Sequence, residues 1–293
     1  MENGMRAVIV SDGKKGHENQ SIAYCRLLGI PYEIVQVRFR SKIYKAFSFL
    51  LDWLGIYTKI FFDPFESKKA DIVVSAGSGT YYANKLLAKS MNAKSIALMY
   101  PRGYRKNFST IYAQLHDDVN DTKAIQIPVN FSYSQKNGVA PCKKGCIALI
   151  VGGPNRHYTM DIQSIKPVVE FLFKTFRDKD IFVTTSPRTP KDVEEFLQSY
   201  PFSYSVIYSK NPVNPIGDFL SCCERVFITI DSTSMISEAV SNGDAAVEVI
   251  PLPGEKRNKY EKMVKNLAKE GNLHIFDGNV GNAGKKIDLR KYL

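Results

Sequence analysis

The chain repeats one pattern along most of its length: a short apolar run, a loop of small or polar residues, and apolar residues at helical spacing. The first copy runs from an apolar segment at 6–11 through a predicted helix at 17–28 to a second apolar segment at 32–37. A strand–helix–strand unit of this kind favours a right-handed crossover and a parallel sheet. The repeat therefore predicts an α/β fold.

The pattern continues, with one interruption. Further strands are predicted at 71–75, 95–99, 110–113, 146–151, 181–185, 203–208, 226–230, 245–250 and 274–276. Between them, helices are predicted at 161–176, 215–222 and 256–269. Around 128–145 Pro, Gly, Ser, Asn and Lys replace the periodicity, which is typical of a linker. We expect Rossmann-like domains at 1–130 and 146–293, joined by a linker at 131–145, which suits a length of 293 residues.

Composition narrows the class of protein. The chain is 44% hydrophobic and 24% charged, as in soluble globular proteins. It has no signal-peptide core and no apolar stretch of ~18 residues, so we expect no transmembrane helix. Five scattered cysteines indicate reduced thiols and a cytoplasmic protein. The net charge of +11 suggests an acidic partner, but no nucleic-acid recognition motif accompanies it, so nucleic acid is disfavoured.

Residues 38–65 are aromatic and basic. One helical face holds Ile43, Phe47, Leu50, Leu54 and Phe61, and a neighbouring face holds Phe49, Trp53, Ile56 and Ile60. So wide an apolar surface suits either a core helix or an interfacial helix on an anionic membrane, where the protein would then be peripheral. The sequence leaves both open.

Hydroxyl side chains follow the strand predicted at 226–230. Asp231, Ser232, Thr233 and Ser234 are good helix N-caps, and the start of a helix attracts anions. Glu238, one turn into the helix, would reach sugar hydroxyls of a nucleotide. An ordinary capped turn is the alternative.

Two other loops in the second half have similar character. The strand at 146–151 leads into GGPNRHY, and the strand at 181–185 leads into SPRTP. Bare glycine amides and arginines suit a phosphate. Because carboxyl ends of parallel strands share one edge, the three loops predict a nucleotide-phosphate site. Its further candidate residues are Gly152, Gly153, Arg156, His157, Ser186 and Arg188.

The first half carries polar candidates of its own. Asp12, His17 and Glu18 gather in the loop after the first strand, which is either a ligand loop or a polar helix start. Neither a Walker loop nor GxGxxG is present. On the same side we place Lys14, Asn19, Gly77 and Ser78.

Two Rossmann-like halves with ligand loops on both are typical of the GT-B architecture, with parallel sheets facing a central cleft. The segments DGKKGHENQ, GGPNRHYT, TSPRTP and DSTSMISEA together resemble the mitochondrial-fission ELM-type family, in matching order over nearly the whole chain. Its bacterial members are predicted nucleotide-sugar enzymes of GT-B type, and its plant namesake is an adaptor in mitochondrial division.

The resemblance implies a glycosyltransferase that moves a sugar from a nucleotide-sugar donor to a lipid-linked or cell-envelope glycan. The second-half residues would hold the donor, with Glu238 on its ribose or sugar. Asp12, His17 or Glu18 would supply the general base. We expect no metal and no cofactor besides the donor, because basic groups and helix dipoles can stabilise the leaving phosphate.

Two other functions fit the same layout. A nucleotide-sugar epimerase of the UDP-GlcNAc 2-epimerase type would convert its substrate without an acceptor. A non-catalytic membrane-associated adaptor would keep its function after Glu238→Ala or Arg188→Ala.

Overall fold

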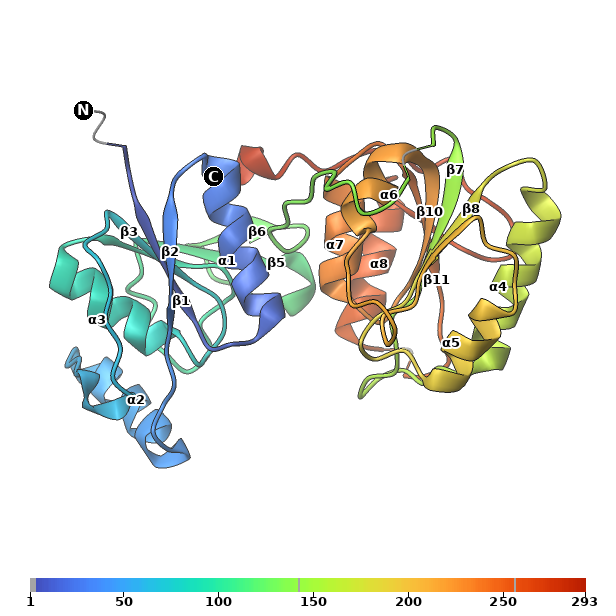
Figure 1. The fold of residues 1–293 in the computed structure, drawn as a ribbon. Coiled ribbons are helices and arrows are strands. Elements are labelled where there is room, and N and C mark those ends of the chain that lie inside the picture. The colour runs from blue at the N-terminus through green and yellow to red at the C-terminus, as the bar shows by residue number, and fades with distance from the viewer. Residues whose placement is uncertain (1–3, 142, 256) are drawn as a thin grey trace. The chain divides into compact units, whose positions relative to one another are not determined.

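The computed structural model describes residues 4–141, 143–255 and 257–293. The chain divides into two compact units, Met1–Tyr133 with Leu289–Leu293, and Ser134–Asp288. Each unit is built on one six-stranded parallel sheet (Figure 1). The α/β prediction is confirmed.

The first unit has the strand order β2-β1-β3-β4-β5-β6. Its strands are β1 (Ala7–Ser11), β2 (Tyr32–Gln36), β3 (Ile72–Ser75), β4 (Lys94–Ala97), β5 (Thr110–Gln114) and β6 (Ala124–Ile127). Its helices are α1 (Lys15–Leu28), α2 (Lys42–Leu54) and α3 (Tyr81–Met91), with short 3-10 helices at Lys59–Phe61, Leu115–Asp117 and Leu289–Tyr292. Strands β1 and β3 are buried throughout because they lie inside the sheet, which explains their continuous apolar sequences.

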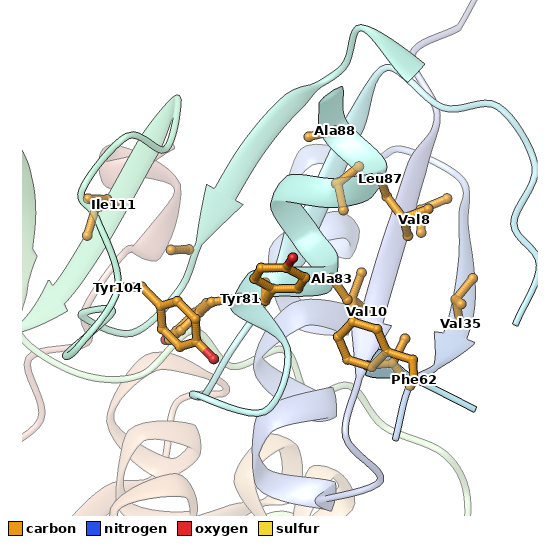
Figure 2. Close-up of a cluster of buried hydrophobic side chains, with 14 of the residues drawn as sticks. Val8, Val10, Val35, Phe62, Tyr81, Ala83, Leu87, Ala88, Tyr104 and Ile111 are labelled. Carbon is orange, nitrogen blue, oxygen red and sulfur yellow. The ribbon is translucent and has the colours of Figure 1, made fainter. Parts of the chain in front are cut away.

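The core of this unit joins the sheet to α3. Val8 and Val10 of β1 belong to the same buried cluster as Leu87 of α3 (Figure 2). Phe61 and Phe62 are also buried in that cluster. The prediction that Phe61 extends the apolar helical face is therefore wrong. Helix α2 ends at Leu54, where Gly55 takes a left-handed conformation with φ of 75°.

The second unit has the order β12-β11-β10-β7-β8-β9, the arrangement of dinucleotide-binding sheets. Its strands are β7 (Cys146–Ile150), β8 (Ile181–Thr184), β9 (Tyr204–Val206), β10 (Cys223–Thr229), β11 (Ala246–Ile250) and β12 (His274–Ile275). Its helices are α4 (Ile162–Thr175), α5 (Lys191–Gln198), α6 (Ile216–Cys222), α7 (Thr233–Ser241) and α8 (Lys259–Lys269).

The segment before β7 is fastened to the second unit. The buried carboxylate of Asp218 accepts hydrogen bonds from the backbone N–H groups of Asn137, Gly138 and Ala140, at 2.9, 3.0 and 2.8 Å. This part of the region predicted as a linker is thus bound to α6 rather than free.

The cysteines differ from expectation. Cys222 is disulfide-bonded, so the prediction of reduced thiols throughout is wrong. Cys25, Cys146 and Cys223 are free and buried, and Cys142 lies outside the described residues. Spacing along the chain did not reveal the bridge, because a disulfide depends on Cα distance in the fold. Within the described ranges, no helix has the length and apolarity needed to cross a membrane.

Candidate active site

The strand orders mark one point in each sheet where a ligand is expected. In parallel sheets, ligands bind beyond the carboxyl ends of the strands where the order reverses. That point lies between β1 and β3 in the first unit, and between β7 and β10 in the second. The candidate loops follow these strands in both units.

In the first unit, an acid and a histidine pair directly after β1. The Nδ1 of His17 lies 3.2 Å from Oδ1 of Asp12 and 3.3 Å from Oδ2. The Nζ of Lys14 lies 3.4 Å from the same carboxylate. In the tautomer whose Nδ1–H donates to Asp12, Nε2 of His17 is the hydrogen-bond acceptor that a general base requires.

Glycines in the loop after β3 make room for this pair. A Cβ added to Gly77 would lie 2.3 Å from Cε1 of His17, and one added to Gly79 would lie 2.9 Å from Oδ2 of Asp12. Gly77 also has a φ of +89°, which favours glycine. The loops after β1 and β3 therefore meet.

Glu18 has a different environment. Its carboxylate is buried and accepts hydrogen bonds from the Ser11 hydroxyl at 2.7 Å and from Nε2 of Gln36 at 2.9 Å. The Ser11 hydrogen bond is the main cause that lowers the pKa of Glu18. A saturated carboxylate with a lowered pKa is a weak base, so His17 is the better of the three candidates. Asn19 is exposed and follows the first turn of α1.

In the second unit, three loops interlock through Arg188. Its Nη1 donates to the carbonyl oxygens of Gly153 and Pro154 at 3.0 and 3.1 Å, and its Nη2 donates to Asp231 at 2.5 Å. Thr189 donates to the carbonyl oxygen of Gly152. The loops after β7, β8 and β10 therefore form one surface.

The glycine amides in this surface are already occupied. Gly152 N–H donates to Oγ1 of Thr229 at 2.8 Å, and Gly153 N–H donates to Asp231 at 3.0 Å. The prediction of bare amides is wrong here, because the fully buried carboxylate of Asp231 accepts the hydrogen bond of the Gly153 N–H. A Cβ on Gly152 would lie 2.2 Å from Asp231, so the glycine permits this close approach. Asp231 accordingly positions the loops.

Two polar features remain on the outside of the loops. Ser232 caps α7 by accepting from the N–H of Met235 at 3.3 Å, and Thr233 and Ser234 form the first turn. Arg156 is exposed and donates to Nε2 of His157 at 2.8 Å. Ser186, which accepts from the N–H of Arg188 at 3.2 Å, is half-buried beside them.

Groups that the sequence analysis missed complete this surface. The Nδ1 of His157 lies 2.6 Å from Oε2 of Glu255, so both of its ring nitrogens are engaged. Tyr260 packs edge-on against His157 and Tyr158. Glu255 and Tyr260 follow β11, and no phosphate-binding pattern marks that region in the sequence.

Glu238 lies one turn into α7. Burial raises the pKa of its carboxyl, and the Ser134 hydroxyl partly opposes this by hydrogen bonding. Glu238 therefore takes up a proton at a higher pH than a free glutamate does.

In the part of the chain that the structure describes, no cluster of three or more His, Cys, Asp or Glu residues is arranged to hold a metal.

Comparison with solved structures shows the class of fold. The structure is similar to the spinosyn forosaminyltransferase SpnP, with a TM-score of 0.52 and 10% identity over 94% of this chain and 86% of that chain. A protein assigned as a UDP-N-acetylglucosamine 2-epimerase from Listeria monocytogenes has a TM-score of 0.50 and 12% identity, over 96% and 92% of the two chains. The fold is that of GT-B glycosyltransferases.

The sequence then gives the family. The model of the Mitochondrial fission ELM1 family matches residues 15–291, and the chain belongs to this family. An uncharacterised protein of Rickettsia prowazekii (strain Madrid E) is 23% identical over 94% of this chain and 92% of its own length.

Proposed function

We propose that the protein is a metal-independent glycosyltransferase that moves a sugar from a nucleotide-sugar donor to a lipid-linked or cell-envelope glycan. One observation carries the proposal. In each of the two GT-B-type sheets, loops with charged and polar side chains gather at the point where the strand order reverses. The clusters differ in the way that acceptor activation and donor binding require. One holds an oriented histidine, and the other holds arginines beside a helix start.

The second unit would bind the donor diphosphate. Arg156 and the N-terminus of α7, with Ser232, Thr233 and Ser234, offer positive potential. Arg188 is 42% exposed, but its charge is balanced by Asp231, so its main role is to hold the loops. Glu238 would accept hydrogen bonds from ribose or sugar hydroxyls when ionised.

The first unit would activate the acceptor. Nε2 of His17 takes the proton of the acceptor hydroxyl, while Asp12 fixes the ring and stabilises the imidazolium. The acceptor oxygen then bonds to the anomeric carbon as the carbon–phosphate oxygen bond breaks. The electron pair leaves with the nucleoside diphosphate, whose charge Arg156 and α7 stabilise.

The donor half is tested by thermal shift with UDP-, GDP-, ADP- and CMP-linked sugars. At least one should raise the melting temperature of the wild type. Arg156→Ala should need about tenfold more ligand to reach the same rise, because a charge-assisted contact is lost. Arg177→Ala removes an exposed arginine elsewhere in the same unit and serves as the control. If no nucleotide sugar stabilised the wild type, the donor site would be refuted.

The acceptor half is tested by sugar transfer to membrane-extracted glycolipids. His17→Asn should lower kcat by about 10²- to 10⁴-fold, as expected when a general base is removed. Glu18→Gln should lower kcat much less than His17→Asn does. Equal losses for the two variants would show that the histidine is not the base.

The likeness to an epimerase supports a second candidate function. An epimerase would change the donor sugar with no acceptor present, which nuclear magnetic resonance of the sugar detects directly. The adaptor alternative predicts that His17→Asn and Arg156→Ala leave the cellular role intact.

A further inference from the structure

Helix α2 exposes most of its large apolar side chains, although Phe49 and Leu51 pack against the core cluster of the first unit. A water-soluble helix normally buries its apolar stripe and exposes its polar residues. In α2 the only fully buried residues are Ser48 and Asp52, one turn apart on the same face. The opposite side carries Ile43, Phe47, Leu50 and Leu54, spaced four, three and four residues apart and all exposed. Trp53, on an adjoining face, is 70% exposed.

The buried polar side chains of α2 are hydrogen-bonded within the first unit. Oδ1 of Asp52 accepts from Nζ of Lys85 at 2.7 Å and from the hydroxyl of Tyr57 at 2.9 Å, and Oδ2 accepts from the N–H of Arg105 at 2.7 Å. The hydroxyl of Ser48 lies 2.9 Å from that of Tyr104. These bonds fix the rotation of α2, so its apolar side cannot turn inward without breaking them.

The exposed apolar area extends past the end of the helix. Ile56 and Ile60, which follow Gly55 in the chain, are 51% and 61% exposed. We call these seven residues the α2 surface; it consists of Ile43, Phe47, Leu50, Trp53, Leu54, Ile56 and Ile60. Contiguous exposed apolar groups on this scale mark an interaction site.

Cations flank the α2 surface along the chain. Arg38, Arg40, Lys42 and Lys59 are exposed on the segments that flank it. The one acid between Arg38 and Phe62 is Asp52, whose charge is buried against Lys85. Between Arg38 and Phe62 the solvent-facing charge is therefore wholly positive, while the acids Asp63 and Glu66 line one pocket together with Arg40 and Lys59.

We propose that the α2 surface docks on an anionic lipid bilayer, with α2 lying in the plane of the interface. The combination of inserted aromatic and aliphatic groups with a basic border fits acyl chains below and acidic headgroups beside them. A second copy of the chain is a poorer occupant, because face-to-face pairing would bring the two basic borders together. At 13 residues, α2 lies on the bilayer and does not cross it.

This docking does not depend on the proposed transferase activity, since it is measured without any nucleotide sugar. The chain contains a single tryptophan, Trp53, and it lies within the α2 surface. Its fluorescence therefore reports on this surface alone. Vesicles of phosphatidylcholine with one third phosphatidylglycerol should shift the emission to the blue, and brominated acyl chains should quench it.

Two double variants separate the docking surface from general hydrophobicity. Phe47→Ser with Leu50→Ser should weaken vesicle binding by about 100-fold, on the basis of roughly tenfold for each side chain lost from the bilayer. Leu115→Ser with Ile125→Ser removes two comparably exposed residues of the same unit outside the surface, and should leave binding unchanged. Lys42→Glu with Lys59→Glu should abolish the preference for phosphatidylglycerol.

Three results would overturn the proposal. They are absence of a blue shift with phosphatidylglycerol vesicles at low salt, equal binding by the two serine variants, and a Phe47-dependent dimer in light scattering that does not bind vesicles. Far-ultraviolet circular dichroism of each variant checks that α2 and the sheet are intact, so that loss of binding is assigned to the surface.

Discussion

The buried pair Asp52–Lys85 gives a quantitative test of how α2 is held. The carboxylate is fully buried and the lysine side chain is 3% exposed, with 2.7 Å between Oδ1 and Nζ. Burial lowers the pKa of Lys85, and the hydrogen bond that Lys85 donates to Asp52 opposes this. Asp52→Ala removes the acceptor of three hydrogen bonds and leaves a buried ammonium ion without its counter-ion.

The expected loss in the free energy of unfolding is roughly 3–5 kcal/mol, the range for breaking a buried ion pair from one side. We place it near ~3 kcal/mol, because Lys85 keeps the carbonyl oxygen of Arg105 at 2.8 Å and the Phe108 ring at 4.6 Å. Removing the charge as well, in Asp52→Leu with Lys85→Met, should recover at least half of the loss, since apolar replacement of a buried pair is often neutral.

Urea unfolding followed by far-ultraviolet circular dichroism measures this loss. Asp63→Ala, which removes an exposed acid of the same unit, is the matched control and should change stability by less than about 0.5 kcal/mol. A loss below about 1 kcal/mol for Asp52→Ala would refute the reasoning, because the pair would then be weakly coupled to the fold. A double variant less stable than Asp52→Ala would refute it as well.

Three further predictions concern the loops and the pH dependence. Gly77→Ala should lower kcat at least tenfold with little change in donor binding, because its Cβ would displace His17; steady-state kinetics and donor titration separate the two. Arg188→Ala should destabilise the second unit by about 1–3 kcal/mol in thermal unfolding, since buried Asp231 loses a cation that is itself partly screened by water. Burial lowers the pKa of Lys286 to about 8 from its ordinary 10.5, so folded Lys286 loses its proton first and stability should rise with pH across that interval. Lys286→Met, in urea titrations at pH 7 and 9.5, should lack this increment.

Much of the fold was predictable because buried parallel strands are continuous apolar runs. Val8 to Val10 and Val226 to Ile228 lie inside their sheets and are apolar at every position. Strand β6 (Ala124–Ile127) was missed; it lies at the sheet edge, where Ile125 is exposed and Gln126 half-buried. The other edge strands, at 32–37, 203–208 and 274–276, were predicted, so the edge position alone does not hide a strand; β6 is also only four residues long and carries two isoleucines among them.

The candidate site was predictable in position and less so in detail. Parallel strands place their carboxyl ends together, which was enough to group the loops of Gly153, Arg188 and Asp231. Their hydrogen bonds follow from side-chain directions that one-dimensional spacing does not contain. The N–H of Gly153 is taken by an acid 78 residues away, so the loop is satisfied internally before any ligand arrives.

The orientation of helix α2 also could not be predicted from the spacing of its residues. Its apolar periodicity is identical for a core helix and an interfacial one, and only the partner of Asp52 decides between them. That partner, Lys85, lies 33 residues away on α3. Once the acid is fixed inward, the apolar stripe points outward by helical geometry.

The loop after β3 connects helix α2 to the proposed general base. Nζ of Lys45 on α2 donates to Oγ of Ser78 at 3.1 Å, and the hydroxyl of Tyr104, which contacts Ser48, donates to the Ser78 carbonyl oxygen at 3.3 Å. The neighbouring Gly77 lies against the ring of His17. Docking of α2 on a bilayer, as proposed, would therefore also orient the proposed base with respect to that bilayer. Such an arrangement would suit an acceptor whose lipid end stays in the membrane while its hydroxyl reaches His17, and on the proposed function it would favour a lipid-linked acceptor over a soluble one.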